Sequence, residues 1–205
     1  DLSNLRMEAF VQMGGTPAAS IAEVGNNSDA VFVMVMNGEQ AKSVILGENG
    51  LASHMSKGGA VLLTATIKPL EAREIDTALQ GSGVHLIDSP VSGGFPRAQN
   101  GTLTMMAAAA SDVLDKYATI MESVSSTIHR VGTHAGEGQV MKSCLQTLIG
   151  SIFGATFEAA ALAAKAGVSG QALYDVFSTS GAGCGVANVA LENIIDRKFE
   201  GTGSG

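Results

Sequence analysis

The sequence predicts an α/β protein in which a parallel, doubly wound sheet is followed by an all-helical part. Two patterns carry this prediction. Over the first two thirds of the chain, short apolar runs alternate with stretches of helical spacing, the order typical of strand–helix–strand units. After Val131 these runs give way to long helical patterns. We therefore expect two domains, at 1–131 and 132–205.

The expected strands are apolar throughout, as strands buried on both faces of a sheet should be. They lie at 31–36, 60–64, 84–88, 102–107 and 127–131. Helical spacing predicts helices at 38–46, 69–80 and 111–123, and Pro69 stands where proline is common, near a helix start. The right-handed crossover rule places the ligand-binding loops at the carboxyl ends of the strands.

The second part opens with the longest helical pattern, at 136–166. It is rich in alanine and ends at Gly167, a residue type that commonly caps the C-terminus of a helix. Two further helices are expected near 169–179 and 186–198. Nothing in this part repeats the strand–helix alternation, so we expect it to be entirely helical.

Composition excludes several classes of function. The 205 residues are 45% apolar and 15% charged with a net charge of −7, and no cluster of Lys and Arg occurs, so we expect no nucleic-acid partner. No apolar run approaches the ~20 residues of a membrane span and no signal peptide is visible, so we expect a cytoplasmic protein without a membrane partner. Cys144 and Cys184 lack metal-site spacing and the four histidines are scattered, so no metal site is expected.

The segment from Asp88 to Ala107 is the most informative about function. A buried strand runs into Ser92-Gly93-Gly94 and then into a second apolar strand. The two glycines let the backbone come close to a ligand. Successive N–H groups, with the Ser92 hydroxyl as an extra donor, can form a nest for an anion. Taken alone, the same pattern also occurs in ordinary loops.

Lys142 is the only lysine inside an otherwise apolar helical stretch. Partial burial would lower its pKa and let it pass a proton near neutral pH. Gln146, four residues further, shares its helix face. Gly136 and Gly138 have no side chains, so that a loop or a ligand can approach the start of the helix. The alternative is a lysine whose stem covers apolar surface while its amine stays in water.

Four residues are candidates for contact with a nicotinamide cofactor. Thr66 follows the strand at 60–64, and Met36 and Asn37 lie where the run 31–36 ends. Thr66 and Asn37 could equally belong to ordinary turns. Asp1 could be the acid that ends the second strand of a dinucleotide-binding fold and binds the adenosine ribose, or it could be a terminal accident.

The phosphate-binding segment of a dinucleotide fold is not found. Such a fold opens with a strand, a G-x-G-x-x-G turn and a helix. The glycines between Gly181 and Gly185 follow a helix instead of a strand, and we interpret them as a loop. We therefore expect that the N-terminal strands of the sheet are missing from this chain.

The motif D-x-P-V-S-G-G-x-x-x-A-x-x-G-T-L, from Asp88 to Leu103, resembles the substrate-binding signature of the 3-hydroxyisobutyrate dehydrogenase family (the β-hydroxyacid dehydrogenases). The resemblance extends to G-x-G-x-x-x-K at 136–142 and to the cofactor loop S-T-I-x-P at 65–69, where Ala65 replaces the usual serine. It covers nearly the whole chain. The sequence is most similar to the branch that contains threonate and other four-carbon acid-sugar dehydrogenases.

This resemblance implies a Rossmann-type domain joined by a long interdomain helix to a helical domain through which homo-oligomers form. It implies hydride transfer between NAD, or alternatively NADP, and a small 3-hydroxy acid such as 3-hydroxyisobutyrate or threonate. The implied catalytic residue is Lys142. The implied substrate contacts are Ser92, Gly93, Gly94 and Gln146, and the implied cofactor contacts are Asp1, Met36, Asn37 and Thr66.

The chain also departs from the family pattern. The opening G-x-G-x-x-G segment and a later K-D-L motif are absent, so we expect an internal piece of a longer enzyme. Cys184-Gly185 stands where this branch usually has Ser-Trp, which leaves the substrate open.

Two alternative functions remain. A glyoxylate or succinic semialdehyde reductase would share the lysine and the Ser-Gly-Gly turn but prefer an aldehyde acid and NADPH, against which Asp1 argues through repulsion of the 2′-phosphate. A truncated, non-catalytic module would keep the long helix for self-association.

Overall fold

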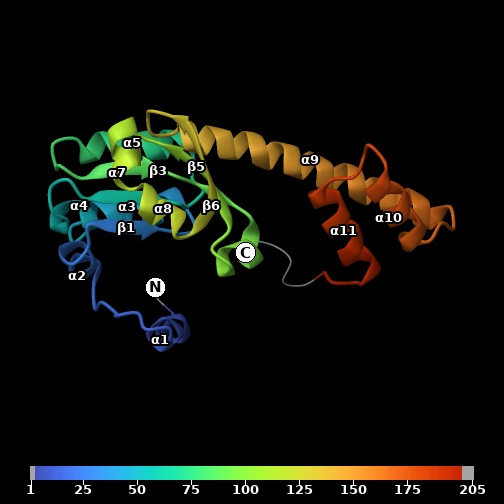
Figure 1. Ribbon diagram of the computed structural model, residues 1–205, viewed down its shortest axis with the longest axis horizontal. Coiled ribbons are helices and arrows are strands. Elements are labelled where there is room, and N and C mark those ends of the chain that lie inside the picture. Colours follow the sequence, from blue (N-terminus) through green and yellow to red (C-terminus); the bar gives the residue numbers. More distant parts are fainter. Residues whose placement is uncertain (1–2, 200–205) are drawn as a thin grey trace. The chain divides into compact units, whose positions relative to one another are not determined.

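The structure, a computed structural model, describes residues 3–199, and Figure 1 traces the elements in chain order. Within these residues, the apolar runs of the first part form a six-stranded sheet. The strands are β1 (Ala30–Val33), β2 (Ala60–Leu63), β3 (His85–Asp88), β4 (Val91–Ser92), β5 (Leu103–Ala108) and β6 (Ser125–Gly132). The predicted α/β fold class is confirmed.

The direction of the strands differs from the prediction for two of the six strands described. The order is β1-β2-β3-β5-β4, with β6 paired to β5. β1, β2 and β3 are parallel, as expected. β5 runs antiparallel to β3 and to β4, and β6 runs parallel to β5. The expectation of a parallel sheet is therefore wrong for β5 and β6, while β4, antiparallel to β5, runs in the direction of β1, β2 and β3.

The short connection after β3 explains this reversal. A parallel crossover usually needs a full helix between its strands. Here the chain continues directly into β4 and then turns back through the six-residue helix α6 (Gly94–Gln99). Because this turn reverses the chain instead of carrying it across the sheet, β5 returns beside β4, with Ser92 opposite Thr104.

Helices pack on both faces of the sheet. One face carries α3 (Gly38–Leu46), α4 (Leu51–His54) and α5 (Pro69–Leu79), and the other carries α7 (Ser111–Lys116) and α8 (Ala118–Glu122). The single helix predicted at 111–123 is thus divided at Tyr117. Two helices that the spacing did not predict, α1 (Asn4–Gln12) and α2 (Ile21–Asn26), begin at serine N-caps.

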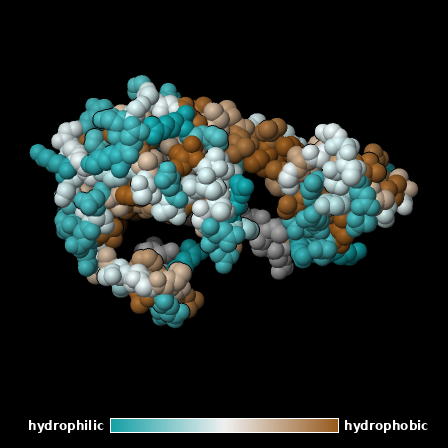
Figure 2. Space-filling view, viewed as in Figure 1, coloured by the Kyte–Doolittle hydropathy of each residue, from teal (hydrophilic) through white to brown (hydrophobic). Residues whose placement is uncertain are grey.

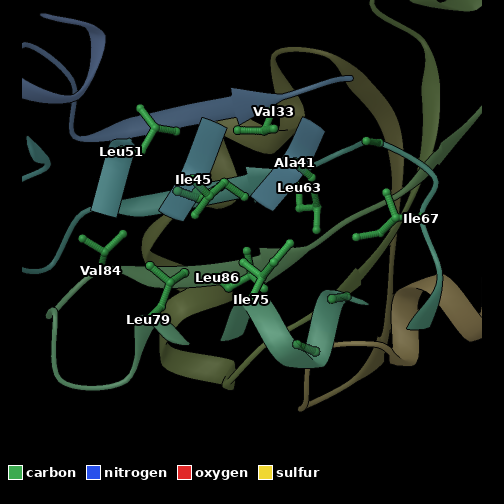
Figure 3. Close-up of a cluster of buried hydrophobic side chains, with 14 of the residues drawn as sticks. Val33, Ala41, Ile45, Leu51, Leu63, Ile67, Ile75, Leu79, Val84 and Leu86 are labelled. Atoms are coloured by element: carbon green, nitrogen blue, oxygen red, sulfur yellow. The ribbon is translucent and has the colours of Figure 1, made fainter. Parts of the chain in front are cut away.

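Two hydrophobic clusters result from the alternation of side chains along the strands. In β2, Val61 and Leu63 face the cluster under α3 and α5, while Ala60 and Leu62 face the cluster under α7 and α8. All four are fully buried. Figure 3 shows the first cluster, which includes Ile67 from the loop after β2. This buried residue fixes that loop against the sheet.

The long helix predicted at 136–166 is α9 (Glu137–Lys165). It ends in a left-handed Gly167, with Val168 N–H bonded to the carbonyl of Ala163 at 2.9 Å. α10 (Gly170–Thr179) and α11 (Gly185–Ile195) follow. The chain divides into compact units at 1–142 and 143–205. This division lies beyond the predicted boundary near 132 because the first turns of α9 pack on the sheet.

α9 is long and apolar enough, by length and composition, to cross a membrane, and only 6% of its most apolar 18-residue window is buried. We expected no apolar run of such a length, and α9 meets the criterion although polar residues interrupt its apolar ones. Figure 2 shows hydrophobic residues along this helix. Exposed large apolar side chains include Met141, Leu148, Phe157 and Leu162. The core helix of a protein without any membrane segment can satisfy the same criteria.

Candidate functional site

The carboxyl ends of β1 and β2 lie side by side, since Val33 pairs with Leu63 in a parallel register. Asn37, which follows β1, caps α3: its side-chain oxygen accepts the Gln40 N–H at 2.9 Å. The Gln40 side chain in turn accepts the Met36 N–H at 3.0 Å. The turn role considered for Asn37 is therefore present, and the Met36 side chain stays exposed at this edge.

Thr66 lies at the same edge, after β2. It is exposed, whereas Ala65 and Ile67 on either side of it are buried. α5 begins at Pro69 as predicted, with Lys68 as its N-cap residue, so Thr66 does not cap this helix. The loop thus presents the threonine to solvent between two anchored neighbours.

The Ser-Gly-Gly turn has the backbone that its glycines predict. Ser92 ends β4, Gly93 has φ +136° and Gly94 has φ +64°. Both angles favour glycine. A Cβ on Gly93 would also lie 2.6 Å from the Arg97 side chain, which itself donates to the Thr104 hydroxyl at 3.2 Å. The turn is therefore a fixed feature of the sheet edge in which neither glycine can be replaced without strain.

Lys142 is 6% exposed. Most of its side chain is therefore covered by the protein, which favours a partly buried lysine over one whose stem lies along an exposed apolar surface. Burial lowers the pKa of this lysine, and the structure gives its amine no hydrogen-bond or ion-pair partner among residues 3–199. A desolvated amine of this kind can exchange a proton at a pH closer to neutrality than an ordinary lysine.

Gly138 is required by close contact with the sheet, and Gly136 by close contact with α5 and by its left-handed backbone. A Cβ on Gly138 would lie 2.8 Å from the carbonyl oxygens of Asp88 and Met106, and one on Gly136 would lie 2.8 Å from the carbonyl oxygen of Pro69. The glycines at the helix start could have made room for a loop or for a ligand. The structure shows that backbone atoms of the same domain approach them closely.

Asp88 is the feature whose role the sequence reasoning missed. Its carboxylate is fully buried and accepts the Gly136 N–H at 2.8 Å and the Gln139 N–H at 3.2 Å, which are backbone groups at the start of α9. The pKa of Asp88 is raised above its ordinary value, because burial raises it by more than the hydrogen bonds from Gln139 and from the backbone lower it. In the sequence, only the polar Gln139 at an otherwise apolar helix start could have indicated a buried polar contact there.

Two predicted residues remain. Gln146 is exposed on α9, in the second unit, and Asp1 lies outside the described residues. Between residues 3 and 199, no group of three His, Cys, Asp or Glu side chains could hold a metal ion. An open cavity of about 350 Å³ lies between the end of α5 and residues 133–135 and includes none of the predicted site residues.

Two family profiles match the chain. Residues 1–132 match the NAD binding domain of 6-phosphogluconate dehydrogenase, and residues 136–204 match a domain described as NAD-binding of NADP-dependent 3-hydroxyisobutyrate dehydrogenase. The first match covers more than half of the chain. The boundary between the two matches lies where β6 ends and α9 begins.

Curated relatives carry the names of dehydrogenases. An L-threonate dehydrogenase of Escherichia coli O6:H1 is 37% identical over 182 residues, which are 89% of this chain and 59% of the relative. An NAD-dependent L-serine dehydrogenase of Pseudomonas aeruginosa is 32% identical over 192 residues, which are 94% of this chain and 63% of the relative. The chain thus spans about three fifths of the length of these proteins.

Among solved structures, a 3-hydroxyisobutyrate dehydrogenase from Salmonella typhimurium superposes with a TM-score of 0.87 at 30% identity. The match covers 97% of this chain and 70% of the other. The order of elements described above, a sheet domain followed by a long helix and further helices, is therefore that of a solved dehydrogenase over nearly all of the present chain.

Proposed function

Because the chain belongs to the family of NAD-binding proteins that includes 6-phosphogluconate dehydrogenase and 3-hydroxyisobutyrate dehydrogenase, we propose that it is part of an NAD(P)-dependent dehydrogenase of a small 3-hydroxy acid. The observation that carries the proposal is Lys142, a desolvated amine with a lowered pKa at the start of α9. Relatives named for threonate, serine and 3-hydroxyisobutyrate favour a hydroxy acid over the aldehyde acid of the alternative reductases.

The residues at the carboxyl edge of β1 and β2 fit a nicotinamide cofactor. Met36, Asn37 and Thr66 follow two adjacent parallel strands, and this edge is where open α/β sheets bind their ligands. The exposed hydroxyl of Thr66 and the exposed face of Met36 are free to contact a flat ring. When bound, the cofactor supplies the acceptor or donor of the hydride.

In this mechanism Lys142 carries the proton. During oxidation its neutral amine accepts the hydroxyl proton of the substrate, and in reduction its ammonium returns a proton to the carbonyl oxygen. The backbone of Ser92, Gly93 and Gly94 binds the substrate carboxylate as an anion nest. Gln146, one turn along α9 from Lys142, is a second substrate contact in this proposal because residues four apart share a helix face.

The exposed apolar surface of α9 supports a homo-oligomer formed through the helical domain. A second copy is a better partner than a membrane, since Lys142, Gln146 and Glu158 divide the helix into short apolar stretches. One Lys or Asp at the centre of a membrane helix costs about 2.5–3.5 kcal/mol. The proposal accordingly places the protein in the cytoplasm, with no membrane partner.

Substitution of Lys142 tests the proposed chemistry. We expect Lys142→Ala to lower kcat for oxidation of L-threonate or 3-hydroxyisobutyrate by about 10²–10⁴-fold, the usual contribution of a positioned acid–base group. The affinity for NADH, measured by fluorescence titration, should stay within about two-fold of wild type, because the lysine acts on the substrate. Lys165→Ala, an exposed lysine at the end of the same helix, is the matched control.

Turnover that survives Lys142→Ala would contradict the proposal, because it would remove the lysine from the mechanism. Clear NADH or NADPH binding by the present chain would contradict the alternative of a non-catalytic association module, whereas absence of binding would fit both that module and an incomplete dehydrogenase domain.

A further inference from the structure

The carboxylate of Asp88 closes the N-terminus of α9. It accepts the N–H groups of Gly136 and Gln139 on Oδ2 and the Gln139 side-chain N–H on Oδ1, at 2.8, 3.2 and 2.8 Å. None of the ion pairs found between residues 3 and 199 includes Asp88. Its charge is therefore stabilised by N–H donors and by the positive end of the helix, and not by a cation.

Gln139 connects this cap to the loop that carries Thr66. Its side-chain oxygen accepts the Ile67 N–H at 3.0 Å, and its Nε2 donates to the Ala65 carbonyl at 3.1 Å as well as to Asp88. Gln139 is fully buried. The amide oxygen thus faces a donor and the amide nitrogen faces two acceptors. A 180° flip of the amide would therefore break these hydrogen bonds.

Lys142 follows Gln139 by three residues, which places the two side chains on one face of α9. Both are buried. The start of α9 cannot move closer to the sheet, because Gly138 already lies against the carbonyl oxygens of Asp88 and Met106. Any displacement of the helix start relative to β3 therefore displaces the lysine amine, and a shift of about 1 Å at a reacting group can cost about 10²-fold in rate.

We propose that Asp88 and Gln139 are positioning residues that hold the Lys142 amine and the Thr66 loop in one fixed geometry. Neither side chain touches the substrate, and both act through other residues. The inference rests on the proposed function, since it assigns the partners of the lysine that carries the proton. It explains why the interior of this domain keeps a charged group and an amide where an apolar pair would fill the same space.

The test compares Asp88→Asn, Gln139→Glu and the double variant. Asp88→Asn turns an NH₂ group toward Gln139 Nε2, so that two donors face each other. Gln139→Glu sets two carboxylates against each other. In the double variant the Asn amide donates to the new carboxylate, which still accepts the Ile67 N–H. The bond between positions 88 and 139 is restored, and only the donation to Ala65 is lost.

We expect kcat for the hydroxy acid to fall at least about ten-fold in each single variant. The double variant should be faster than either single one by roughly three-fold or more. Thermal unfolding is followed in parallel. Gln139→Met, which leaves the backbone N–H groups on Asp88, is the milder variant if a single variant does not fold, and it should also lower kcat.

A second readout follows the lysine itself. Titration of the Lys142 ε-carbon by NMR of ¹³C-lysine-labelled protein, with Lys142→Met to assign the signal, reports the environment of the amine without any turnover. The midpoint should move toward that of an ordinary lysine in both single variants and return toward wild type in the double variant, because a displaced amine regains water.

The outcomes separate the two proposals. Single variants that lose thermal stability but keep kcat and the Lys142 titration unchanged would show Asp88 and Gln139 to be structural only, and would overturn the inference. If the full-length enzyme oxidises no hydroxy acid, the proposed function fails. The NMR titration of Lys142 then tests the inference without turnover. A titration midpoint that moves in the single variants supports the positioning role of Asp88 and Gln139, and an unmoved midpoint overturns that role.

Discussion

At the scale of single residues, Lys142 determines a pH dependence of stability. Its folded-state pKa is lowered by burial, so between that lowered value and the ordinary lysine value of about 10.4 the unfolded chain binds more protons than the folded one. In this window the free energy of unfolding rises with pH, and below it the cost of the buried amine is constant.

Lys142→Met should remove this dependence. The variant is expected to be more stable than wild type at neutral pH by about 0.5–2 kcal/mol, because a methionine fills the site without a charge to desolvate. Urea unfolding at a series of pH values, from neutral to alkaline, measures the effect. Lys165→Met is the control, since that side chain is exposed and its amine stays hydrated in both states. A wild-type curve that is flat over this range would contradict the burial of the amine.

At the scale of an element, the start of α9 is fixed by contact between backbones. Gly138 leaves room for the carbonyl oxygens of Asp88 and Met106, which would lie 2.8 Å from any Cβ at that position. Gly150, in the same helix, has no atom within 4 Å of such a Cβ. The two glycines therefore differ in what they contribute, although both interrupt a helix of otherwise good formers.

Alanine substitution should separate these two roles. Gly138→Ala is expected to lower the free energy of unfolding by about 1–3 kcal/mol, since backbone must move to admit the methyl group. Gly150→Ala should raise it by about 0.5–1 kcal/mol, the usual gain when a helical glycine becomes alanine. Denaturant unfolding of the two variants beside wild type gives both values. Equal stabilisation in both variants would mean that the helix start does not pack on the sheet.

The sequence predicted the elements of this domain better than their directions. Apolar runs located β1, β2 and β3, and Pro69 located the start of α5. A continuous apolar run does not show in which direction a strand runs, so the antiparallel direction of β5 could not be derived from it. The role of Gln139 was equally inaccessible, because its partners Ala65 and Ile67 lie 74 and 72 residues away in the chain.

The candidate site was predicted in part. Local sequence singled out Lys142 and the Ser-Gly-Gly turn but left the burial of the lysine open, and the structure shows a covered side chain and two glycines with positive φ. The Asp88 carboxylate was visible within a motif, but its use as a helix cap depends on where α9 begins in space. Helical spacing also could not show that most of α9 would remain uncovered within the chain.

At the scale of the whole molecule, the apolar surface of α9 predicts self-association. Leu148 is 59% exposed and Leu162 is 70% exposed. If a second copy covers them, Leu148→Glu combined with Leu162→Glu should weaken association at least ten-fold, or about 1.4 kcal/mol. Sedimentation velocity over a range of protein concentrations measures this. Lys165→Glu, which changes charge at the exposed end of the helix, is the control, and a wild-type chain that is monomeric throughout would contradict the prediction.

The cap on α9 also has a consequence for the order in which the chain can be completed. β1, β2 and β3 pair with neighbours in sequence, so this half of the sheet can form early during synthesis. Asp88 meets its donors only 48 and 51 residues later, at Gly136 and Gln139. Until the ribosome has released that segment, the carboxylate must stay in water, and the end of β3 remains open. The Asp88 carboxyl group is thus enclosed only after the six strands between residues 30 and 132 have been synthesised.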